Sequence, residues 1–248
     1  MQKGSGKRKG PMLGFWLETD NLAACEIGAI VGYDIVVLDM EHGAISTDAA
    51  DRLVSHAKRL GLKVYSRVAT AARVPIQQAL DFGADGIIVP QITDVAHARD
   101  VAALAKYPPL GSRGIGFSRT MDYGGVDDAF LDAENRRTLC FLMIETPDAL
   151  RDAEKIAALE TVDGLFIGPS DLAATRGRGL PKESKEDEAD ARSVAEAAVR
   201  RKKRWGIPAG TPKAFAFARE LGADFVTIND DLSAMRAGLE QALSLAET

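Results

Sequence analysis

The chain of 248 residues is poor in cysteine and has no long apolar run. Its two cysteines, Cys25 and Cys140, are too few for a disulfide framework, so we expect a cytoplasmic protein. No apolar segment approaches the roughly 20 residues that span a bilayer, so we expect no membrane partner. The net charge of -5 gives no reason to expect a nucleic acid partner either.

The segment 1–11 is rich in Lys and Arg and lacks the continuous apolar stretch that a secretory signal needs. We therefore predict a flexible basic tail over 1–11. Because no domain boundary is visible after it, we predict one domain over 12–248.

Short apolar segments alternate with longer helical patterns along this domain. Most of the apolar segments do not alternate with polar residues, which is typical of parallel strands covered on both faces. The predicted strands cover 13–17, 34–39, 63–67, 86–90, 139–145, 164–168, 206–210 and 224–229. The predicted helices cover 46–60, 74–82, 94–105, 146–158, 187–204, 212–221 and 231–246.

Eight such units predict an α/β fold, the (β/α)8 TIM barrel. The doubly wound sheet is the alternative, but Leu17 is followed by "ETDNLAA" instead of a Gly-rich fingerprint. The segment 106–138 is an insertion, and its "YPPLGSRGIGFSR" is rich in Pro and Gly, which favours a loop.

Polar residues follow the predicted strands where a barrel carries its active site, at the carboxyl ends. They are Asp39, Glu41 and His42 after strand two, Arg67 at the end of strand three, Gln91 after strand four, Glu145 at the end of strand five, and "GPSD" (168–171) after strand six. The barrel would bring these residues to one rim.

Glu145 and Asp171 are candidate metal ligands. A carboxylate at the end of a buried strand is unfavourable unless a positive charge neutralises it. Oxygen ligands suit Mg²⁺ or Mn²⁺ better than Zn²⁺. The alternative is a plain salt bridge between Glu145 and Arg67. Ser170 or Asp171 could also cap the following helix, whose first amides could bind a carboxylate.

His42 is a candidate general base, because Asp39 lies three positions earlier and could orient or charge the imidazole. A hydrogen-bonded loop residue is the alternative. A Schiff-base aldolase would need a lysine at the rim, and Lys213 is the one lysine placed to reach it. The lysine positions therefore favour metal chemistry over imine chemistry.

Four motifs in order, "LDMEHGAIS", "ALDFGADGIIVPQITDVAHARDVAALAKYPPLGSRGIG", "IETPDA" and "VDGLFIGPSDLAA", resemble the HpcH/HpaI aldolase family of metal-dependent class II pyruvate aldolases. The resemblance runs from about Gly14 to Leu239. It implies a (β/α)8 barrel that is a homo-oligomer, often a hexamer with an exchanged last helix.

Position by position, the resemblance implies roles for the residues at the rim. Glu145 and Asp171 would be ligands of a divalent metal ion, Mg²⁺, Mn²⁺ or Co²⁺. His42 would be the base and Asp39 its partner, while Arg67 would contact the pyruvate oxygen. Substrate would also contact Ser170 and Gly168 in the turn, Trp16 at the mouth, and Gln91.

The resulting hypothesis is a lyase that cleaves a 4-hydroxy-2-oxo acid to pyruvate, or a close 2-oxo acid, and an aldehyde. A metal ion and Arg67 would stabilise the enolate, and His42 would take the C4 hydroxyl proton through a water. Two alternatives stay open: an acyl-CoA lyase of the citrate-lyase β-subunit type, and a barrel that binds a 2-oxo acid without turnover. Met143 departs from the family pattern, which commonly has Gln there.

Overall fold

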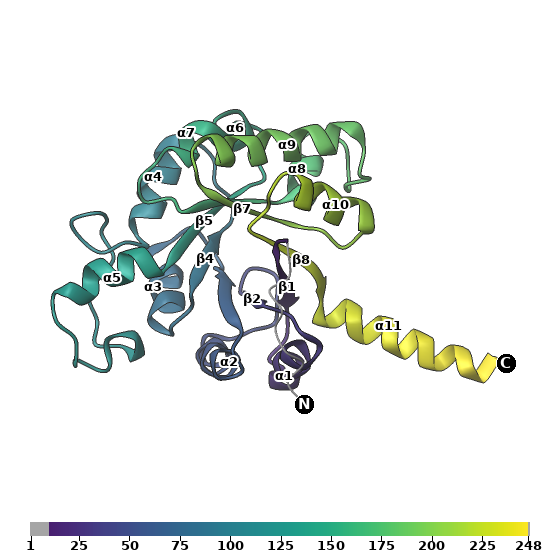
Figure 1. Ribbon diagram of the computed structural model, residues 1–248, viewed down its shortest axis with the longest axis horizontal. Coiled ribbons are helices and arrows are strands. Elements are labelled where there is room, and N and C mark those ends of the chain that lie inside the picture. Colours follow the sequence, from purple (N-terminus) through teal and green to yellow (C-terminus); the bar gives the residue numbers. More distant parts are fainter. Residues whose placement is uncertain (1–9, 248) are drawn as a thin grey trace.

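The computed structural model describes residues 10–247 and shows a closed barrel of eight parallel strands (Figure 1). The strands are β1 (Met12–Leu17), β2 (Ile35–Asp39), β3 (Lys63–Arg67), β4 (Gly86–Val89), β5 (Leu139–Ile144), β6 (Gly164–Ile167), β7 (Arg204–Pro208) and β8 (Phe225–Asp230). Each strand pairs with the next in parallel, and β1 pairs with β8 to close the barrel. The predicted (β/α)8 fold is confirmed. The expected tail over 1–11 lies almost wholly outside the described residues.

Helices surround the barrel (Figure 1). They are α1 (Leu22–Val31), α2 (Thr47–Arg59), α3 (Arg73–Asp81), α4 (Val95–Ala103), α5 (Ala129–Arg137), α6 (Pro147–Arg151), α7 (Ala153–Ala157), α8 (Pro169–Thr175), α9 (Lys185–Arg200), α10 (Pro212–Glu220) and α11 (Asp231–Ser244), with the 3-10 turns η1 (Arg119–Met121) and η2 (Leu245–Glu247). The helix predicted over 146–158 is two helices, because the chain changes direction at Asp152. Helices α1 and α5 were not predicted, and α8 was expected only as the helix that follows "GPSD", without limits.

Aromatic side chains fill the barrel interior. Tyr65, Phe141, Phe166 and Phe225 are all buried, and the Phe225 ring centroid lies 5.1–5.5 Å from the other three. The outer faces of the strands pack against the helices in two further apolar clusters. The strands are therefore buried on both faces, as their apolar sequences predicted.

Two buried cations fasten the insertion between β4 and β5 to the barrel. Lys106 Nζ donates hydrogen bonds to the backbone oxygen of Thr138 at 2.7 Å and forms an ion pair with Asp163 at 2.7 Å. Arg113 Nη2 donates to Asp81 Oδ1 at 2.7 Å. The predicted loop "YPPLGSRGIGFSR" has no α-helix or strand of its own, and only its last residue, Arg119, enters the 3-10 turn η1; charged contacts hold it in place.

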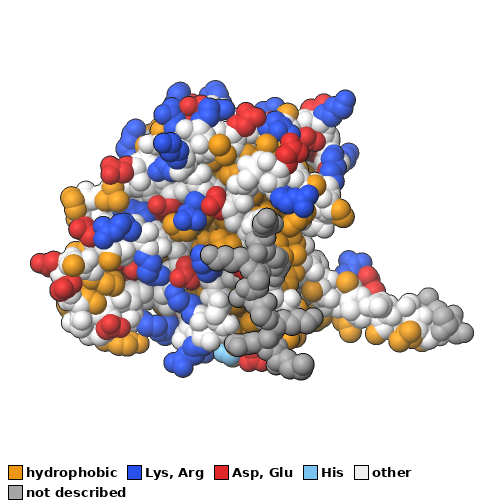
Figure 2. Space-filling model, viewed as in Figure 1, with side chains coloured by type: hydrophobic (Ala, Val, Ile, Leu, Met, Phe, Trp, Pro, Cys, Tyr) orange, Lys and Arg blue, Asp and Glu red, His pale blue; other side chains and the backbone are white. Residues whose placement is uncertain are grey.

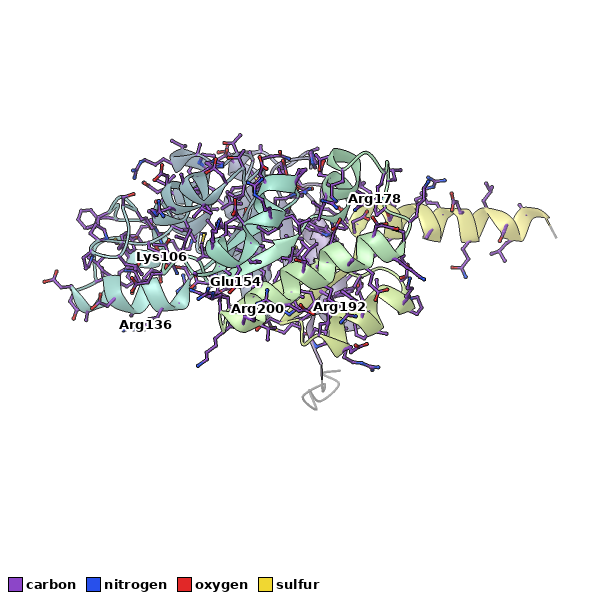
Figure 3. All side chains as sticks on the ribbon, turned by 90° about the horizontal axis from the view of Figure 1, so that it is seen from above. Lys106, Arg136, Glu154, Arg178, Arg192 and Arg200 are labelled. Carbon is purple, nitrogen blue, oxygen red and sulfur yellow. The ribbon has the colours of Figure 1, made fainter. Side chains whose placement is uncertain are left out.

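Helices on the outer surface are joined by ion pairs as well. Glu154 of α7 lies beside α9, and its carboxylate pairs with Arg200 at 3.1 Å and with Arg201 at 2.9 Å (Figure 3). These pairs lie at the outer surface, where such contacts contribute about 0–1 kcal/mol each. They hold α7 against α9 but are too weak to determine the fold.

Helix α11 projects away from the barrel (Figure 1). Asp231 is its one buried residue, and the helix is exposed from Leu232 onward. Figure 2 shows apolar side chains along this projection, and the exposed ones are Leu232, Met235, Leu239, Leu243 and, just beyond the helix, Leu245. None of the helices described within residues 10–247 has the length and apolar character of a membrane-spanning segment.

Candidate active site

A cavity of about 160 Å³ lies at the carboxyl ends of the strands. It is lined by Trp16, Glu18, Asp39, Arg67, Met143, Glu145, Phe166, Gly168, Pro169, Ser170, Asp171 and Pro208. Seven of the nine residues predicted for the site are in this set. His42 and Gln91 are outside it, although both adjoin residues that line it.

Arg67 at the end of β3 and Asp39 at the end of β2 form a charged pair in the lining of the cavity. Arg67 Nε donates to Asp39 Oδ1 at 2.9 Å, and Nη2 donates to Asp39 Oδ2. Burial of Asp39, which is 1% exposed, would raise the pKa of its carboxyl, but the hydrogen bonds and charge of Arg67 outweigh burial and lower it. Arg67 pairs with Asp39 and Glu41 among the described residues, so the alternative salt bridge to Glu145 is not formed.

The loop after β2 places His42 and Asp39 differently from the predicted dyad. Asp39 Oδ1 accepts hydrogen bonds from the backbone N–H groups of Glu41 and His42, both at 3.1 Å. The His42 side chain is 64% exposed, and its Nε2 lies 3.8 Å from Glu41 Oε2. Glu41 also lies 3.4 Å from Arg67 Nη1, so Glu41 connects the imidazole to the arginine.

Gly43 explains why this loop can lie against β1. A Cβ at this position would lie 2.4 Å from the Asp39 backbone oxygen and 2.8 Å from that of Glu18. The Ala44 N–H donates to the same Glu18 oxygen at 2.7 Å. A side chain here would therefore separate the loop from the end of β1.

Glu145 is a buried carboxylate without a cationic partner among residues 10–247. It is 1% exposed, and its Oε1 accepts a hydrogen bond from the Gln91 backbone N–H at 2.5 Å. Burial, with the nearby charges of Glu41 and Asp171, raises the pKa of Glu145 to about 7. Gln91 contributes this N–H from a left-handed conformation, with φ 57°, which few residues other than glycine adopt.

Asp171 and Ser170 reach the cavity from the first turn of α8. Their predicted role as helix caps is wrong: Gly168 is the N-cap, and no side chain caps this helix. The N–H groups of the first turn have no partner within the helix, and the Ser170 and Asp171 side chains line the cavity instead.

Gly168 provides the space for the Glu145 carboxylate. A Cβ on Gly168 would lie 2.7 Å from Glu145 Oε2 and 2.9 Å from Glu145 Cβ. Any larger residue would displace the carboxylate. The glycine of the "GPSD" turn therefore allows this turn to pack closely against Glu145, which follows β5.

The donor set of this cavity fits a hard divalent cation. Glu145 and Asp171 offer carboxylate oxygens, and burial, with the charges of Glu41 and Asp171, raises the pKa of Glu145. Within residues 10–247 there is no group of three His, Cys, Asp or Glu side chains arranged to hold a metal, so water and substrate would supply the other ligands.

Comparison with known proteins shows the family of the chain. A sequence model described as HpcH/HpaI aldolase/citrate lyase matches residues 12–209. The chain belongs to the HpcH/HpaI aldolase/citrate lyase family. The predicted family and its class, a carbon–carbon lyase, are confirmed.

Several relatives of this family resemble the chain over most of its length. It is 30% identical over 242 residues to the 2-dehydro-3,6-dideoxy-6-sulfogluconate aldolase of Pseudomonas putida, covering 96% of this chain and 93% of the relative. It is 37% identical over 174 residues to the 4-hydroxy-2-oxovalerate aldolase of Novosphingobium aromaticivorans, covering 68% and 65%. The crystal structure of an HpcH/HpaI aldolase from Desulfitobacterium hafniense superposes with a TM-score of 0.89 at 29% identity, covering 96% and 93%.

Lys213 and Met143, the two positions singled out in the sequence, line different cavities. Lys213 Nζ donates to the backbone oxygen of Glu183 at 2.8 Å and lines a separate cavity of about 230 Å³. Met143, 2% exposed, lines the candidate active-site cavity next to Gly168. Among the described residues, the lining of this cavity thus includes a thioether and no lysine.

Sequence reasoning missed Glu18, Phe166 and Pro208 as lining residues. Glu18 directly follows β1, as Asp39 and Glu145 end or follow their strands, so its position was a usable signal. Phe166 lies within β6 and packs edge-on against Trp16 with centroids 5.8 Å apart. Nothing in its apolar strand distinguishes it from a core residue.

Proposed function

We propose that this chain is a divalent-metal-dependent aldolase that cleaves a 4-hydroxy-2-oxo acid to pyruvate, or a close 2-oxo acid, and an aldehyde. The observation that carries the proposal is the buried Glu145 carboxylate beside Asp171, with no cation paired to it among the described residues. The named activities of the relatives support it, since each is an aldolase acting on an oxo or dehydro acid.

Glu145 and Asp171 would hold the metal ion, with Mg²⁺, Mn²⁺ and Co²⁺ as candidates. When bound, the ion supplies Lewis-acid stabilisation of negative charge on the substrate oxygen. The Gln91 N–H orients Glu145 for this role, and Gly168 leaves room for it.

Arg67 and the α8 turn would bind the oxo-acid half. The guanidinium is held in place by Asp39 and by the face of Trp16, whose centroid lies 4.8 Å from Arg67 Cζ. It presents positive charge where the C2 oxygen becomes negative as the C3–C4 bond breaks. The first-turn amides of α8, next to Ser170 and Gly168, would bind the substrate carboxylate.

His42 would move the proton. In the cleavage direction its imidazole takes the C4 hydroxyl proton through a water and returns a proton to C3 after the aldehyde forms. Glu41, 3.8 Å from His42 Nε2, supports the imidazolium in this proposal, while Asp39 holds the loop through its backbone contacts.

The test is pyruvate release from a 4-hydroxy-2-oxo acid with Mg²⁺, Mn²⁺ or Co²⁺. We expect release that chelation abolishes and added metal restores, and almost none from Glu145→Ala. Full activity after thorough chelation, or turnover of malyl-CoA in preference to free acids, would contradict the proposal. The control is Glu160→Ala, because Glu160 is an exposed carboxylate outside the cavity.

We also propose a homo-oligomer, in the form of a hexamer with an exchanged C-terminal helix. The exposed apolar residues of α11, together with Ile27, Ile30 and Val31 of α1, support this assembly. A cytoplasmic location is proposed from the free cysteines Cys25 and Cys140, both buried.

A further inference from the structure

Glu18 brings a free carboxylate to the cavity. Its backbone is held on both sides: the N–H donates to Asp231 Oδ1 at 2.9 Å, and the carbonyl accepts from the Ala44 N–H at 2.7 Å. No hydrogen bond or ion pair to its side-chain carboxylate is formed within the described part of the chain. The backbone is thus fixed while the side chain is free to meet a ligand.

The charge around Glu18 is negative. Partial burial, followed by the charges of Asp230, Asp39 and Asp231, raises the pKa of Glu18. Arg67 is the single cation among the residues lining the cavity, and it is already paired with Asp39 and Glu41. The β1 side of the mouth therefore carries a net negative charge, which the charge of Arg67 offsets only in part.

The aldehyde half of the substrate would contact the lining residues that the oxo-acid half does not use. In the proposed function, the oxo-acid half uses Glu145, Asp171, Arg67 and the α8 turn. What is left is a polar pair and four less polar groups: Asp39, which is bound to Arg67, Glu18, and the side chains of Trp16, Met143, Phe166 and Pro208. The Trp16 Nε1 already donates to Thr227 Oγ1 at 2.8 Å, so it is not available.

We propose that Glu18 is a specificity-determining residue that selects uncharged hydroxyaldehydes and disfavours aldehydes that carry an anionic group. This inference rests on the proposed aldolase function. A hydroxyl near the reacting carbon donates a hydrogen bond to the Glu18 carboxylate, which gains an otherwise missing partner. An anionic group at the same place meets a like charge in a partly buried site, and such contacts exclude a ligand strongly.

The experiment measures aldol addition of pyruvate to three aldehydes of equal carbon number. Glyceraldehyde is uncharged and hydroxylated, propanal lacks the hydroxyls, and malonate semialdehyde is anionic. The unmodified chain is expected to prefer glyceraldehyde to propanal, and propanal to malonate semialdehyde, by kcat/KM.

Two variants separate charge from hydrogen bonding. Glu18→Gln keeps an acceptor but removes the charge, so kcat/KM for malonate semialdehyde relative to glyceraldehyde should rise roughly tenfold, equivalent to about 1.4 kcal/mol. Glu18→Ala removes both, so the preference for glyceraldehyde over propanal should disappear as well. Glu160→Gln, outside the cavity, should leave both ratios unchanged.

Exchange of the pyruvate methyl protons with deuterated solvent distinguishes the possible failures, because it needs no aldehyde. If each variant exchanges the protons but the ratios do not move in Glu18→Gln, the role of Glu18 is refuted while the aldolase function stands. A preference of the unmodified chain for malonate semialdehyde or for the cationic 3-aminopropanal over glyceraldehyde also refutes it. Neither exchange nor cleavage in the unmodified chain with any metal overturns the proposed function and this inference with it.

Discussion

Replacing Arg67 by alanine tests how much the ion pair between Arg67 and Asp39 contributes to the free energy of unfolding. The Asp39 carboxylate is 1% exposed, and without Arg67 it retains the two backbone N–H donors at 3.1 Å. Removing one partner of a buried pair costs about 3–5 kcal/mol, because an uncompensated charge is left inside. The retained donors place Arg67→Ala near 3 kcal/mol, a large share of the roughly 5–15 kcal/mol that stabilises a domain.

Asp39→Asn is the complementary change and should cost less. Arg67 would still pair with Glu41 at 3.4 Å and pack on Trp16. We expect the double variant to be less destabilised than the sum of the single variants, with a coupling free energy of about 1–3 kcal/mol. Arg52→Ala, which breaks the exposed pair with Asp20, is the control and should cost about 0–1 kcal/mol.

The same pair predicts a pH dependence. The folded pKa of Asp39 is lowered, so its contribution is complete above its unfolded pKa of about 3.9 and is lost as the pH falls through the lower folded value. The difference in unfolding free energy between the unmodified chain and Asp39→Asn should therefore shrink below about pH 4.

The assay is urea unfolding followed by tryptophan fluorescence at pH 7 and at a series of lower pH values. The reasoning is refuted if Arg67→Ala unfolds within about 0.5 kcal/mol of the unmodified chain, the range of ordinary surface substitutions. Strict additivity in the double variant would refute it equally.

Three further predictions concern the metal site and the surface. Glu145→Gln should weaken Mn²⁺ binding by more than the roughly 10–100-fold typical of outer-shell changes, and an unchanged Kd by calorimetry would contradict this. Gly168→Ala should cost about 1–3 kcal/mol in urea unfolding and also weaken Mn²⁺ binding, because its Cβ would meet Glu145 Oε2 at 2.7 Å. Gly238→Ala, with open space around its Cβ in α11, is the control and should not destabilise. Leu239→Asp should lower the mass measured by light scattering, since it puts a charge on the exposed apolar face of α11. An unchanged mass, or the same loss in Gln241→Asp, would count against the proposed interface.

Much of the fold could be predicted because the barrel strands are buried on both faces and read as apolar runs. The strand limits agree within two residues, and the largest shift is in β7, predicted at 206–210 and found at Arg204–Pro208. There Arg204 follows a basic run and looks like the end of a helix. Helix α1 was missed because "LAACEIGAIV" is apolar on most sides and lacks the polar face that marks a surface helix.

The parts of the site that depend on side chains could be predicted from the sequence. Those that depend on backbone conformation could not. Glu145, Asp171 and Arg67 could be placed because charged residues at strand ends converge in a barrel. The Gln91 N–H depends on a left-handed backbone conformation, which residue type alone does not reveal. The link from His42 to Glu41 instead of Asp39 depends on how tightly the loop turns at Gly43.

The aromatic rings inside the barrel limit how ligands can enter and leave the cavity. Tyr65, Phe141, Phe166 and Phe225 block the interior below the cavity, so whatever enters between the strand ends must leave by the same mouth. Glu145 lies deep, at 1% exposure, while Glu18 is only partly buried at the rim. An oxo acid held at Glu145 would sit behind an aldehyde at Glu18. If the chain acts as proposed, the aldehyde would therefore leave before pyruvate, and in the reverse direction pyruvate would bind before the aldehyde.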